Sequence, residues 1–328
     1  MLSIIVTAYR EEKTIAKVVR HLLDSQFSGL GKHKLDSAWE LILVAPDVQT
    51  RSAAKQELKK LAIPETNWQI LIDQQKGKPV ALNMCLAVAK GDWLLLTDGD
   101  VTFGKNAVWE IVELAEAGQK SHIAGAQLLG GVSSRPVGKL AKTTMLNYWG
   151  KLLADAAHHK RTLDLTEHSE GFSRRIVPKR KFFPLTGYGM LIRNLNWVLP
   201  EDILADDAYI SYGLHNQGFR LGYAPEARVL VKYPTKLSDY FKQKKRSTGG
   251  YLQLWQYGVV RPETKSRSFW RELEYFWFPI RYAQNLREVI WSLLLYPTRA
   301  WLWLLIFWER KVQKKSFKKT WVRVESTK

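Results

Sequence analysis

The stretch Trp93–Val101, "WLLLTDGDV", decides which fold the chain is expected to adopt. Its apolar half is typical of a buried β-strand, and that strand ends abruptly at two aspartates, Asp98 and Asp100, with Gly99 between them. Alternate residues of a strand point the same way, so the two carboxylates are expected to converge, and Gly99 would let a ligand approach. Such a pair suits Mg²⁺ or Mn²⁺ bound partly through substrate phosphates, whereas Asp-Gly-Asp taken alone is more simply a turn.

Upstream of this stretch, short apolar runs alternate with segments in which apolar residues recur at helical spacing. The expected strands are residues 2–8, 39–45, 68–74 and 92–98, and the expected helices are 12–25, 52–62 and 81–90. Alternating strands and helices predict βαβ units and a mostly parallel sheet. In such sheets ligands bind beyond the carboxyl ends of the strands, which is where the two aspartates fall.

Downstream of residue 105 the alternation loosens. Further helices are expected at 107–118, 138–159, 206–218 and 237–258, and strands at 122–129, at both ends of 174–193 and at 220–231. We therefore expect an α/β protein in three parts. These parts are two halves of one α/β domain, 1–105 and 106–250, and a helical, Trp-rich, basic region, 251–328.

The composition points to a partner that carries phosphate. The 328 residues have a formal net charge of +19 and include 14 tryptophans. This combination favours binding to nucleic acid or to an anionic membrane. The single cysteine, Cys85, excludes an internal disulfide. The apolar stretch at the N-terminus is too short for the core of a signal peptide, so we interpret it as the first strand.

The C-terminal run Val289–Trp308 is just long enough and apolar enough to span a bilayer. Pro297 and Arg299 lie at its middle, where a proline breaks a helix and a charge is costly, so two half-length interfacial helices or a re-entrant hairpin are expected instead. The tail 309–328 holds eight Lys or Arg against two Glu, which favours attraction to anionic lipid. The alternative is an apolar hairpin packed on the protein's own core.

Three further groups of residues could accompany the two aspartates. Lys76 and Lys78 lie on a glycine turn before a helix, where they could bind phosphate or simply be solvated. Asp47 follows the second strand and could accept hydrogen bonds from a nucleoside, or serve as an ordinary loop acid. Asp206 and Asp207 open a helix, where one acid suffices as a cap and the other is left to act as a base.

Taken together and in order, the segments "SIIVTAYREEKTI", "GKPVALN", "LLLTDGDV", "TGYGMLIR", "ADD" and "QKKRSTGG" resemble family 2 glycosyltransferases with the GT-A fold. The resemblance covers residues Leu2–Tyr251, and the ordered set is far more specific than any one segment. It implies a Rossmann-like, mostly parallel sheet flanked by helices, and the apolar C-terminal run adds a helical, membrane-associating segment to this expectation. It also implies that 1–105 holds a nucleotide-diphospho-sugar donor and that 106–250 holds the acceptor and the catalytic groups.

The resemblance assigns roles residue by residue. Asp98 and Asp100 correspond to the DxD motif, which holds Mg²⁺ or Mn²⁺ against the diphosphate. Asp206 and Asp207 correspond to the ED motif, in which the second acid is the catalytic base and the first would hold the acceptor or orient the loop. The donor-site residues are then expected to be Thr7, Tyr9, Glu11, Asp47, Lys76, Lys78 and Asp98. The acceptor-side loop, where small residues permit close approach, would be Thr186, Gly187, Tyr188 and Gly189.

Processive, membrane-bound members that resemble cellulose synthase carry a Q-x-x-R-W motif. Gln243 and Arg246 match it, and Arg246 would pair with the diphosphate leaving group. Ser247 replaces the tryptophan that serves as a stacking platform for the acceptor, which counts against processive polymer synthesis. Similarly, "APD" keeps an acid at Asp47 but lacks the other contacts of the more usual "DDGS".

The resulting hypothesis is an inverting, metal-dependent glycosyltransferase of cell-envelope polysaccharide synthesis. It would lie at the cytoplasmic face of the cell membrane, with a peripheral, monotopic or re-entrant attachment. Its expected partners are a nucleotide-diphospho-sugar donor, a glycan or polyprenyl-linked acceptor and an anionic membrane surface, with no nucleic acid. Three alternatives remain: a nucleotidyltransferase using the same metal, a catalytically reduced family member that serves as a scaffold, and a basic membrane-binding or nucleic-acid-binding protein.

Overall fold

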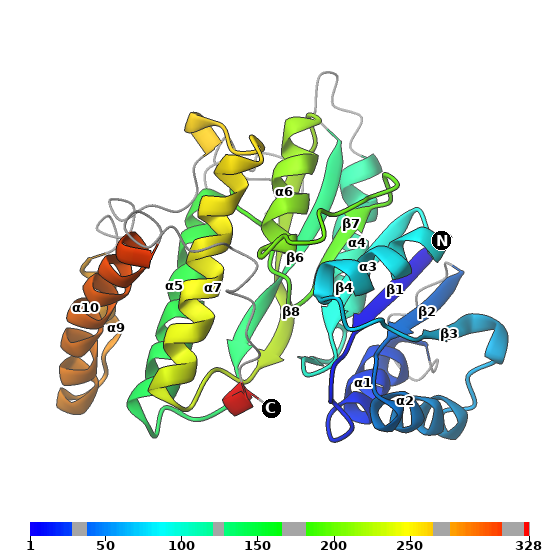
Figure 1. Ribbon diagram of the computed structural model, residues 1–328, viewed down its shortest axis with the longest axis horizontal. Coiled ribbons are helices and arrows are strands. Elements are labelled where there is room, and N and C mark those ends of the chain that lie inside the picture. Colours follow the sequence, from blue (N-terminus) through cyan, green and yellow to red (C-terminus); the bar gives the residue numbers. More distant parts are fainter. Residues whose placement is uncertain (28–37, 121–127, 166–181, 265–275, 310–324, 328) are drawn as a thin grey trace. The chain divides into compact units, whose positions relative to one another are not determined.

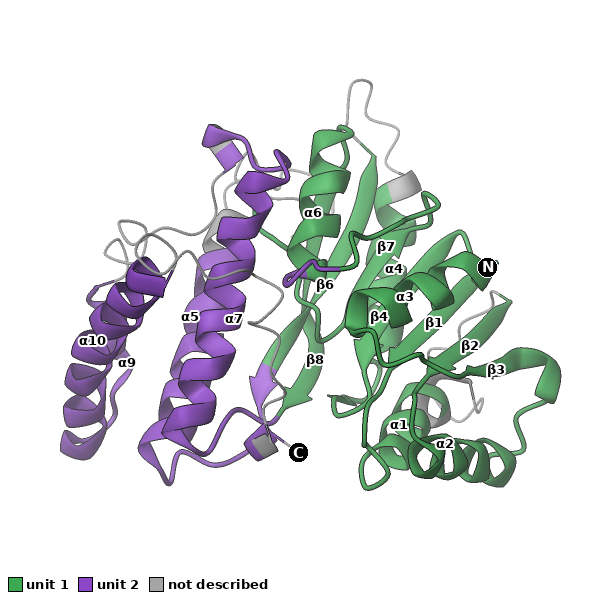
Figure 2. Ribbon diagram, viewed as in Figure 1, with its two compact units in different colours: residues 1–136, 164–201, 206–231 green, residues 137–163, 202–205, 232–328 purple. Residues whose placement is uncertain are grey.

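The computed structural model describes residues 1–27, 38–120, 128–165, 182–264, 276–309 and 325–327. The chain divides into two compact units (Figure 2). Unit 1 comprises residues 1–136, 164–201 and 206–231, and unit 2 comprises residues 137–163, 202–205 and 232–328. The strand expected at the start of 174–193, nearly all of the strand expected at 122–129 and most of the basic tail fall outside the described residues.

Unit 1 is built on an eight-stranded sheet in the order β3-β2-β1-β4-β7-β6-β8-β5 (Figure 1). The strands are β1 (Leu2–Thr7), β2 (Trp39–Val44), β3 (Trp68–Leu71), β4 (Trp93–Asp98), β5 (Thr102–Phe103), β6 (Leu129–Gly138), β7 (Met190–Arg193) and β8 (Arg220–Val231). The β1–β2, β1–β4 and β2–β3 pairs are parallel, whereas the β4–β7, β6–β7 and β5–β8 pairs are antiparallel. The four strands expected from the apolar runs before residue 100 thus form the parallel part.

Helices flank this sheet on both faces. They are α1 (Ile15–Phe27), α2 (Val48–Lys60), α3 (Lys78–Val88), α4 (Ala107–Lys120) and α6 (Asp206–Asn216), with a short 3₁₀ turn at Glu65–Asn67. The helix α3 packs on β1 and β2, and α4 packs on β7 and β8. Both α3 and α6 lie on the face turned to the viewer in Figure 1. The helical spacing predicted for α1 is confirmed, because Ile15, Val18, Val19 and Leu22 are all buried.

The parallel register brings the ends of four strands to one edge of the sheet. Thr7, the last residue of β1, is paired with both Val44 of β2 and Asp98 of β4. Val44 is in turn paired with Leu71, the last residue of β3. Because the chain leaves all four strands at the same edge, the loops that follow them meet there. The edge is therefore the place predicted for a ligand from the βαβ pattern.

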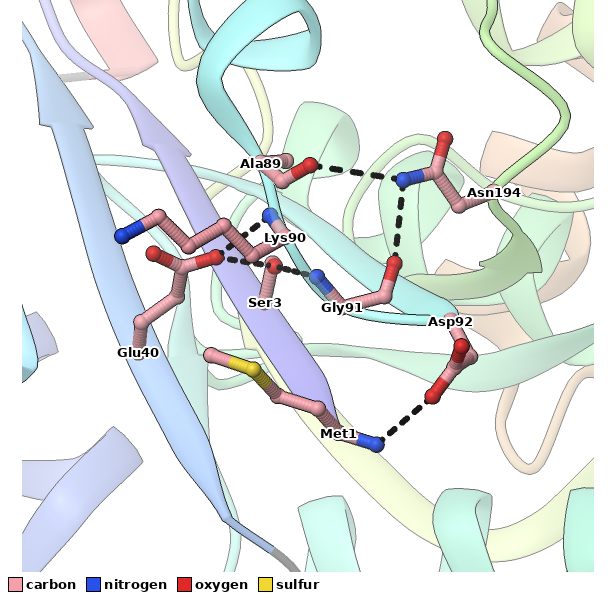
Figure 3. Close-up of polar contacts among 8 residues, drawn as sticks. All are labelled: Met1, Ser3, Glu40, Ala89, Lys90, Gly91, Asp92 and Asn194. Atoms are coloured by element: carbon pink, nitrogen blue, oxygen red, sulfur yellow. Dashed lines mark hydrogen bonds and ion pairs between the residues drawn. The ribbon is translucent and has the colours of Figure 1, made fainter.

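At the opposite edge, a polar cluster fixes the relative positions of these strands (Figure 3). The buried Glu40 carboxylate accepts hydrogen bonds from Ser3 Oγ and from Lys90 N, both at 2.7 Å. Ser3 Oγ accepts a further bond from Gly91 N at 2.8 Å, and Asn194 Nδ2 donates to Gly91 O at 3.0 Å. A slip of one residue would leave these groups unpaired, so the cluster stabilises the register that aligns the strand ends.

The second half of unit 1 differs from expectation at β6. The strand was expected to end at Leu129, before two glycines, but it begins there and runs through both of them. A Cβ on Gly130 would lie 2.5 Å from Phe219 Cβ, and one on Gly131 would lie 2.8 Å from Leu185 Cδ1. The glycine pair therefore marks close packing inside a strand rather than a turn. By contrast, the expected strand 220–231 is confirmed as β8.

Unit 2 is helical. It contains α5 (Met145–Leu165, up to residue 163), α7 (Leu237–Gln256), α9 (Phe278–Tyr282) and α10 (Leu286–Phe307), with 3₁₀ turns at Pro262–Thr264 and Glu325–Thr327. Large side chains from α5, α7 and α10 form its buried core: Tyr148, Trp149, Leu152, Tyr240 and Leu295. The ring centroids of Trp149 and Tyr240 are 5.6 Å apart, so the core of unit 2 is held largely by aromatic packing.

The helix α10 corrects the expectation of a break at Pro297. It continues from Leu286 to Phe307 with the proline inside it. Thr298 Oγ1 donates to the carbonyl oxygen of Leu294 at 2.8 Å, so the turn around the proline keeps a hydrogen bond that a side chain supplies. By length and composition α10 could cross a membrane. Of its most apolar stretch of 18 residues, 22% is buried within the protein. It is a candidate membrane-associating segment.

Candidate active site at the carboxyl edge of the sheet

One lysine and two carboxylates meet at the carboxyl edge of the parallel strands. Lys78 Nζ lies 2.8 Å from Asp98 Oδ1 and 3.1 Å from Asp206 Oδ2. Thr7 Oγ1 also donates to Asp98 Oδ1, at 3.1 Å. The side chains of Lys78, Asp98 and Asp206 are only 24%, 28% and 15% exposed. They come from the starts of α3 and α6 and from the end of β4, so only the fold brings these charges together.

The turn before α3 places Lys78. Gly77 has a φ of +110°, which favours glycine, and Pro79 follows at the start of the helix. Burial by itself would lower the pKa of Lys78, but the carboxylates of Asp206 and Asp98 outweigh it and hold that pKa above its ordinary value. The lysine is therefore a cation held between two anions. The sequence suggested phosphate as its ligand and gave no sign of these carboxylate partners.

A second contact ties α3 to the loop that leads towards α6. Asn83 Nδ2 donates to Leu199 O, and Asn83 Oδ1 accepts from Leu199 N, both at 2.8 Å. One side chain thus satisfies a backbone donor and a backbone acceptor at once. No motif or spacing in the sequence indicates a role for Asn83. The available signal was an asparagine inside a helix, a position that asparagine does not favour without a partner for its amide.

Asp100 lies near Asp98 for a different reason from the one predicted. The strand β4 ends at Asp98, and Gly99 and Asp100 form a turn in which Val101 N approaches Asp98 O at 3.4 Å. The argument from strand alternation was therefore wrong, because Asp100 is beyond the strand. A Cβ on Gly99 would lie 2.7 Å from Ala8 Cβ. The space that glycine leaves is taken by Ala8, a neighbour from the loop after β1, and not by a ligand.

This contact gives a stability prediction. Gly99→Ala is expected to lower the free energy of unfolding by about 2 kcal/mol, because the methyl group of Ala8 is fixed to the backbone and cannot move aside cheaply. Chemical denaturation of Gly99→Ala, Ala8→Gly and the double variant would measure it. In the double variant the obstructing methyl is gone, so the two effects should not add. Additive effects would show that the close approach of residues 8 and 99 does not determine the choice of glycine.

The donor set at this edge suits a divalent cation only if a substrate completes it. Among the described residues, no group of three or more His, Cys, Asp or Glu side chains could hold a metal ion. Asp98 and Asp100 supply two carboxylates on adjoining parts of one turn. Mg²⁺ is commonly bound by one or two carboxylates together with substrate phosphates and water, and Mn²⁺ also prefers oxygen ligands. The residues present therefore fit a cation that arrives with a phosphorylated ligand.

The loop after β1 is held in place by Glu11. This residue is only 3% exposed, and its Oε2 accepts from Thr14 Oγ1 at 2.9 Å. Thr14 Oγ1 also lies 2.9 Å from Gly99 O, so a residue that the sequence left unassigned links this loop to the turn after β4. Tyr9 is partly exposed, and the guanidinium of Arg10 lies 5.2 Å from the centre of its ring. These contacts make Glu11 a support for the loop, and its contact with a donor stays a prediction.

Asp47 caps α2. Its Oδ1 accepts from Thr50 N and its Oδ2 accepts from Arg10 N, both at 2.8 Å. Desolvation would raise the pKa of Asp47, but the hydrogen bonds from Thr50 and Arg10 outweigh it and lower that pKa. The carboxylate therefore stays ionised and fixed at the carboxyl edge. Lys76 is exposed in the turn before α3. Contacts of both residues with a nucleotide stay predictions.

Asp207, the second residue of α6, is oriented by backbone amides. Its Oδ2 accepts from Gly187 N at 3.1 Å and its Oδ1 accepts from Ala208 N at 2.8 Å. Ser211 Oγ donates to Asp207 O at 2.6 Å and so fixes the backbone as well. The pKa of Asp207 is raised, mainly because burial removes water from the carboxylate and secondly because the negative charge of Asp206 lies nearby. A fixed carboxylate with a raised pKa is suited to accept a proton.

The segment expected to contact an acceptor is anchored from behind. Thr186 N donates to Ser133 Oγ at 3.1 Å, and Tyr188 O accepts from Thr97 Oγ1 at 2.9 Å. Thr186 is itself buried. The anchoring residues lie on β6 and β4, so the sheet fixes this loop beside the start of α6.

The two glycines of this loop, Gly187 and Gly189, are required for different structural reasons. A Cβ on Gly187 would lie 3.3 Å from Asp207 Oδ2, so glycine keeps space next to the carboxylate. A Cβ on Gly189 would lie 2.9 Å from Phe103 Cζ and from Ser134 Oγ. Close packing in the core accounts for Gly189, whereas only Gly187 fits the expectation that small residues leave room beside the reacting group.

Gln243 and Arg246 lie about one turn apart on α7, in unit 2, and both are partly buried. Ser247 Oγ donates to Lys244 O at 3.2 Å, so the residue in place of the expected tryptophan bonds to its own helix. These residues belong to a different unit from Asp98 and Asp207. Their part in the site stays a prediction.

Solved structures with a similar fold include a mannosyltransferase and TarS, which was solved with a nucleotide sugar. The mannosyltransferase PcManGT from Pyrobaculum calidifontis, in complex with GDP-Man and Mn²⁺, is 15% identical with a TM-score of 0.53, and the match covers 97% of this chain and 85% of that one. S. aureus TarS 1-349 in complex with UDP-GlcNAc is 13% identical with a TM-score of 0.51, and the match covers 89% and 79%. These matches confirm the expected GT-A type of fold.

The sequence itself identifies the family. A search of curated proteins gives no match. The family described as Glycosyl transferase family group 2 matches residues 93–309. The family described as Glycosyl transferase family 2 matches residues 3–179, which include β1, β4 and the turn with Asp98 and Asp100. This match covers more than half of the chain, so the chain belongs to glycosyl transferase family 2.

Proposed function

We propose that this protein is an inverting glycosyltransferase that moves a sugar from a nucleotide-diphospho-sugar to a hydroxyl or phosphate acceptor. The observation that carries the proposal is the contact of Lys78 with both Asp98 and Asp206, one residue before Asp207. It joins groups suited to a diphosphate to a group suited to remove a proton. Family membership supports sugar transfer from an activated donor, and the inverting course, the acceptor and the metal belong to the proposal.

The donor would bind where the loops after β1 to β4 meet. Asp98 and Asp100 would hold a Mg²⁺ or Mn²⁺ ion, which when bound neutralises charge on the diphosphate. In support, the Pyrobaculum mannosyltransferase was solved with GDP-Man and Mn²⁺. Thr7 keeps Asp98 oriented through its 3.1 Å hydrogen bond. Lys78 supplies a fixed positive charge of the protein's own near the leaving nucleoside diphosphate, and Arg246 would supply a second.

Asp207 would act as the general base. The acceptor oxygen forms a bond to the anomeric carbon while the bond from that carbon to the diphosphate oxygen breaks, and the bonding electrons leave with the nucleoside diphosphate. The proton of the acceptor hydroxyl passes to the Asp207 carboxylate. Gly187 N and Ala208 N hold that carboxylate in one orientation. A single displacement of this kind inverts the anomeric configuration.

The acceptor is proposed to be a glycan or a polyprenyl-linked acceptor of cell-envelope polysaccharide synthesis. The reaction would take place at the cytoplasmic face of the cell membrane, where nucleotide sugars are made. The apolar helix α10 supports attachment to a membrane. Residues 1–105 would bind the donor and residues 106–250 would bind the acceptor. Residues 251–328 would attach the protein to the membrane. The Thr186–Gly189 loop is the proposed acceptor contact, and its proximity to Asp207 supports this.

Calorimetric titration with GDP and UDP, in Mn²⁺ and in EDTA, tests the donor site. The wild-type protein is expected to bind one of these nucleotides only with Mn²⁺. Asp100→Ala should weaken that binding at least about tenfold, or roughly 1.4 kcal/mol. Asp92→Ala, a matched control at the opposite edge of the sheet, should bind like wild type. If neither the wild type nor the control bound a nucleotide, the result would argue against a transferase and favour a scaffold. Equal nucleotide binding in EDTA and in Mn²⁺ would argue against a metal ion in the donor site.

A further inference from the structure

Large apolar side chains are exposed along the whole of α10. Those of at least 46% exposure are Leu286, Ile290, Leu293, Leu294, Trp301, Leu304, Phe307 and Trp308, the last of which follows the helix directly. Their spacing of three or four residues places them on one face of the helix. Pro297 and Ala300 are exposed on the same face. We call this face the α10 stripe. No Asp, Glu, Lys or Arg lies within it.

The stripe is longer than an incidental surface patch. At a rise of 1.5 Å per residue, a helix of 22 residues is about 33 Å long. Exposed apolar patches of such extent mark a contact with a protein or with a membrane. Trp277, which is 63% exposed, adds to the apolar surface next to α10, because Phe276 beside it stacks on Tyr296 with ring centroids 4.6 Å apart.

The other face of α10 is fixed to unit 2, which argues against a membrane span. Ser292 Oγ lies 2.6 Å from Tyr148 Oη, and Trp149 Nε1 donates to Trp291 O at 2.7 Å. Both partners belong to α5, which also carries Lys151 and other charged residues. A helix crossing the bilayer in this packing would carry the charges of α5 towards the hydrocarbon region, which is costly. A helix lying in the plane of the membrane exposes only its stripe to lipid.

The charges around α10 are arranged for an anionic surface. Its acid Glu288 is only 4% exposed and accepts a hydrogen bond from Gln284 N. Glu309, just beyond the helix, is paired with Lys245. Arg281 and Arg287 are exposed. The sequence that follows, 309–328, contains eight Lys or Arg against two Glu. Among the described residues, Glu288 is thus buried and Glu309 is paired, while two arginines are exposed. Together with the basic sequence that follows, this suits lipids with negatively charged headgroups.

We propose that the α10 stripe docks in the plane of an anionic lipid bilayer, with Trp277, Trp301 and Trp308 at the level of the headgroups. Tryptophan combines an apolar ring with a polar N–H and is enriched at this level. The proposal deepens the membrane attachment in the proposed function, on which it rests for its biological setting. It does not depend on sugar transfer, because the contacts that carry it all lie within unit 2.

Sedimentation of the full-length protein with vesicles tests the surface. Binding to phosphatidylcholine vesicles containing phosphatidylglycerol is expected to exceed binding to pure phosphatidylcholine and to fall with salt. The double variant Leu294→Glu/Leu304→Glu should lower the partition coefficient at least about tenfold. Both positions are exposed, so the fold should be kept. Val198→Glu, at an apolar residue that is 77% exposed in unit 1, is the matched control and should bind like wild type.

Depth measurements distinguish an in-plane helix from a span. Cys85 is fully buried and burial raises its pKa, so single cysteines introduced by Leu286→Cys, Leu294→Cys and Leu304→Cys can be labelled selectively with a fluorophore. Quenching by brominated lipids should place all three labels at the same shallow depth. A label at residue 294 that is much deeper than the other two would overturn the proposal in favour of a span.

Two other results would also count against the surface. Equal vesicle binding by the double variant and wild type would exclude the stripe as the lipid contact. Absence of vesicle binding, together with a dimer in sedimentation equilibrium that Leu294→Glu/Leu304→Glu dissociates, would assign the stripe to a second copy of the chain. Vesicle binding with no nucleotide binding by calorimetry would preserve this proposal and reject the proposed function, so the two failures can be told apart.

Discussion

Replacing Asp207 by asparagine is expected to lower the turnover number by about 10³-fold while leaving donor binding unchanged. The amide has the same shape as the carboxylate and can still accept from Gly187 N or Ala208 N, but it cannot take the proton of the acceptor. Donor binding should be preserved because the groups proposed to hold the diphosphate include Lys78 and Asp98, and Asp207 is not one of them. Single-turnover product formation and calorimetry with the donor nucleotide would measure the two effects separately.

The matched control is Glu201→Gln, which makes the same chemical change at an exposed acid a few residues earlier. It should leave turnover unchanged. In the wild type, kcat/KM is expected to fall as the pH is lowered through the raised pKa of Asp207, because only its ionised form accepts a proton. Asp206→Asn removes a neighbouring negative charge and should move that fall to lower pH. Full turnover in Asp207→Asn would assign the base to another residue.

The parallel half of the sheet could be predicted because its signals are local. Each strand is an apolar run, each helix has apolar residues at helical spacing, and the alternation of the two determines the topology. The position of Asp98 at a strand end follows from the same pattern. The sequence therefore predicts a carboxyl edge with acids and lysines, and the pairing of Thr7 with Asp98 confirms that the strand ends meet there.

The contacts within the site could not be predicted, because they join residues far apart in the chain. The sequence around Lys78 does not indicate that this lysine lies between Asp98 and Asp206. It also does not indicate that the side chain of Asn83 forms hydrogen bonds with the backbone of Leu199. Local rules also misled where tertiary packing overrides them. The sequence predicts that a strand ends at Leu129, directly before Gly130, although this glycine is packed inside a strand. Pro297 was expected to break a helix that continues through it.

Lys78→Met is expected to lower the free energy of unfolding in EDTA by about 2 kcal/mol. Removing one member of a buried ion pair typically costs about 3–5 kcal/mol because a charge is left without its partner, and the effect should be smaller here since these side chains are 15–28% exposed. Methionine keeps the length of the side chain, so the loss should report the charge. Chemical denaturation in EDTA would measure it, with Lys55→Met at an exposed position of α2 as the control.

The same variant tests whether lysine and metal compete for one carboxylate. Lys78 Nζ is 2.8 Å from an oxygen of Asp98, the residue proposed to bind the cation. A positive charge at that distance opposes a second cation, so its removal should tighten the binding of Mn²⁺ to the free protein about tenfold, or roughly 1.4 kcal/mol. Mn²⁺ should then raise the stability of Lys78→Met more than that of wild type. If Mn²⁺ stabilised both proteins equally, Asp98 would not be shared, and Lys78 would serve only to join β4 to α6.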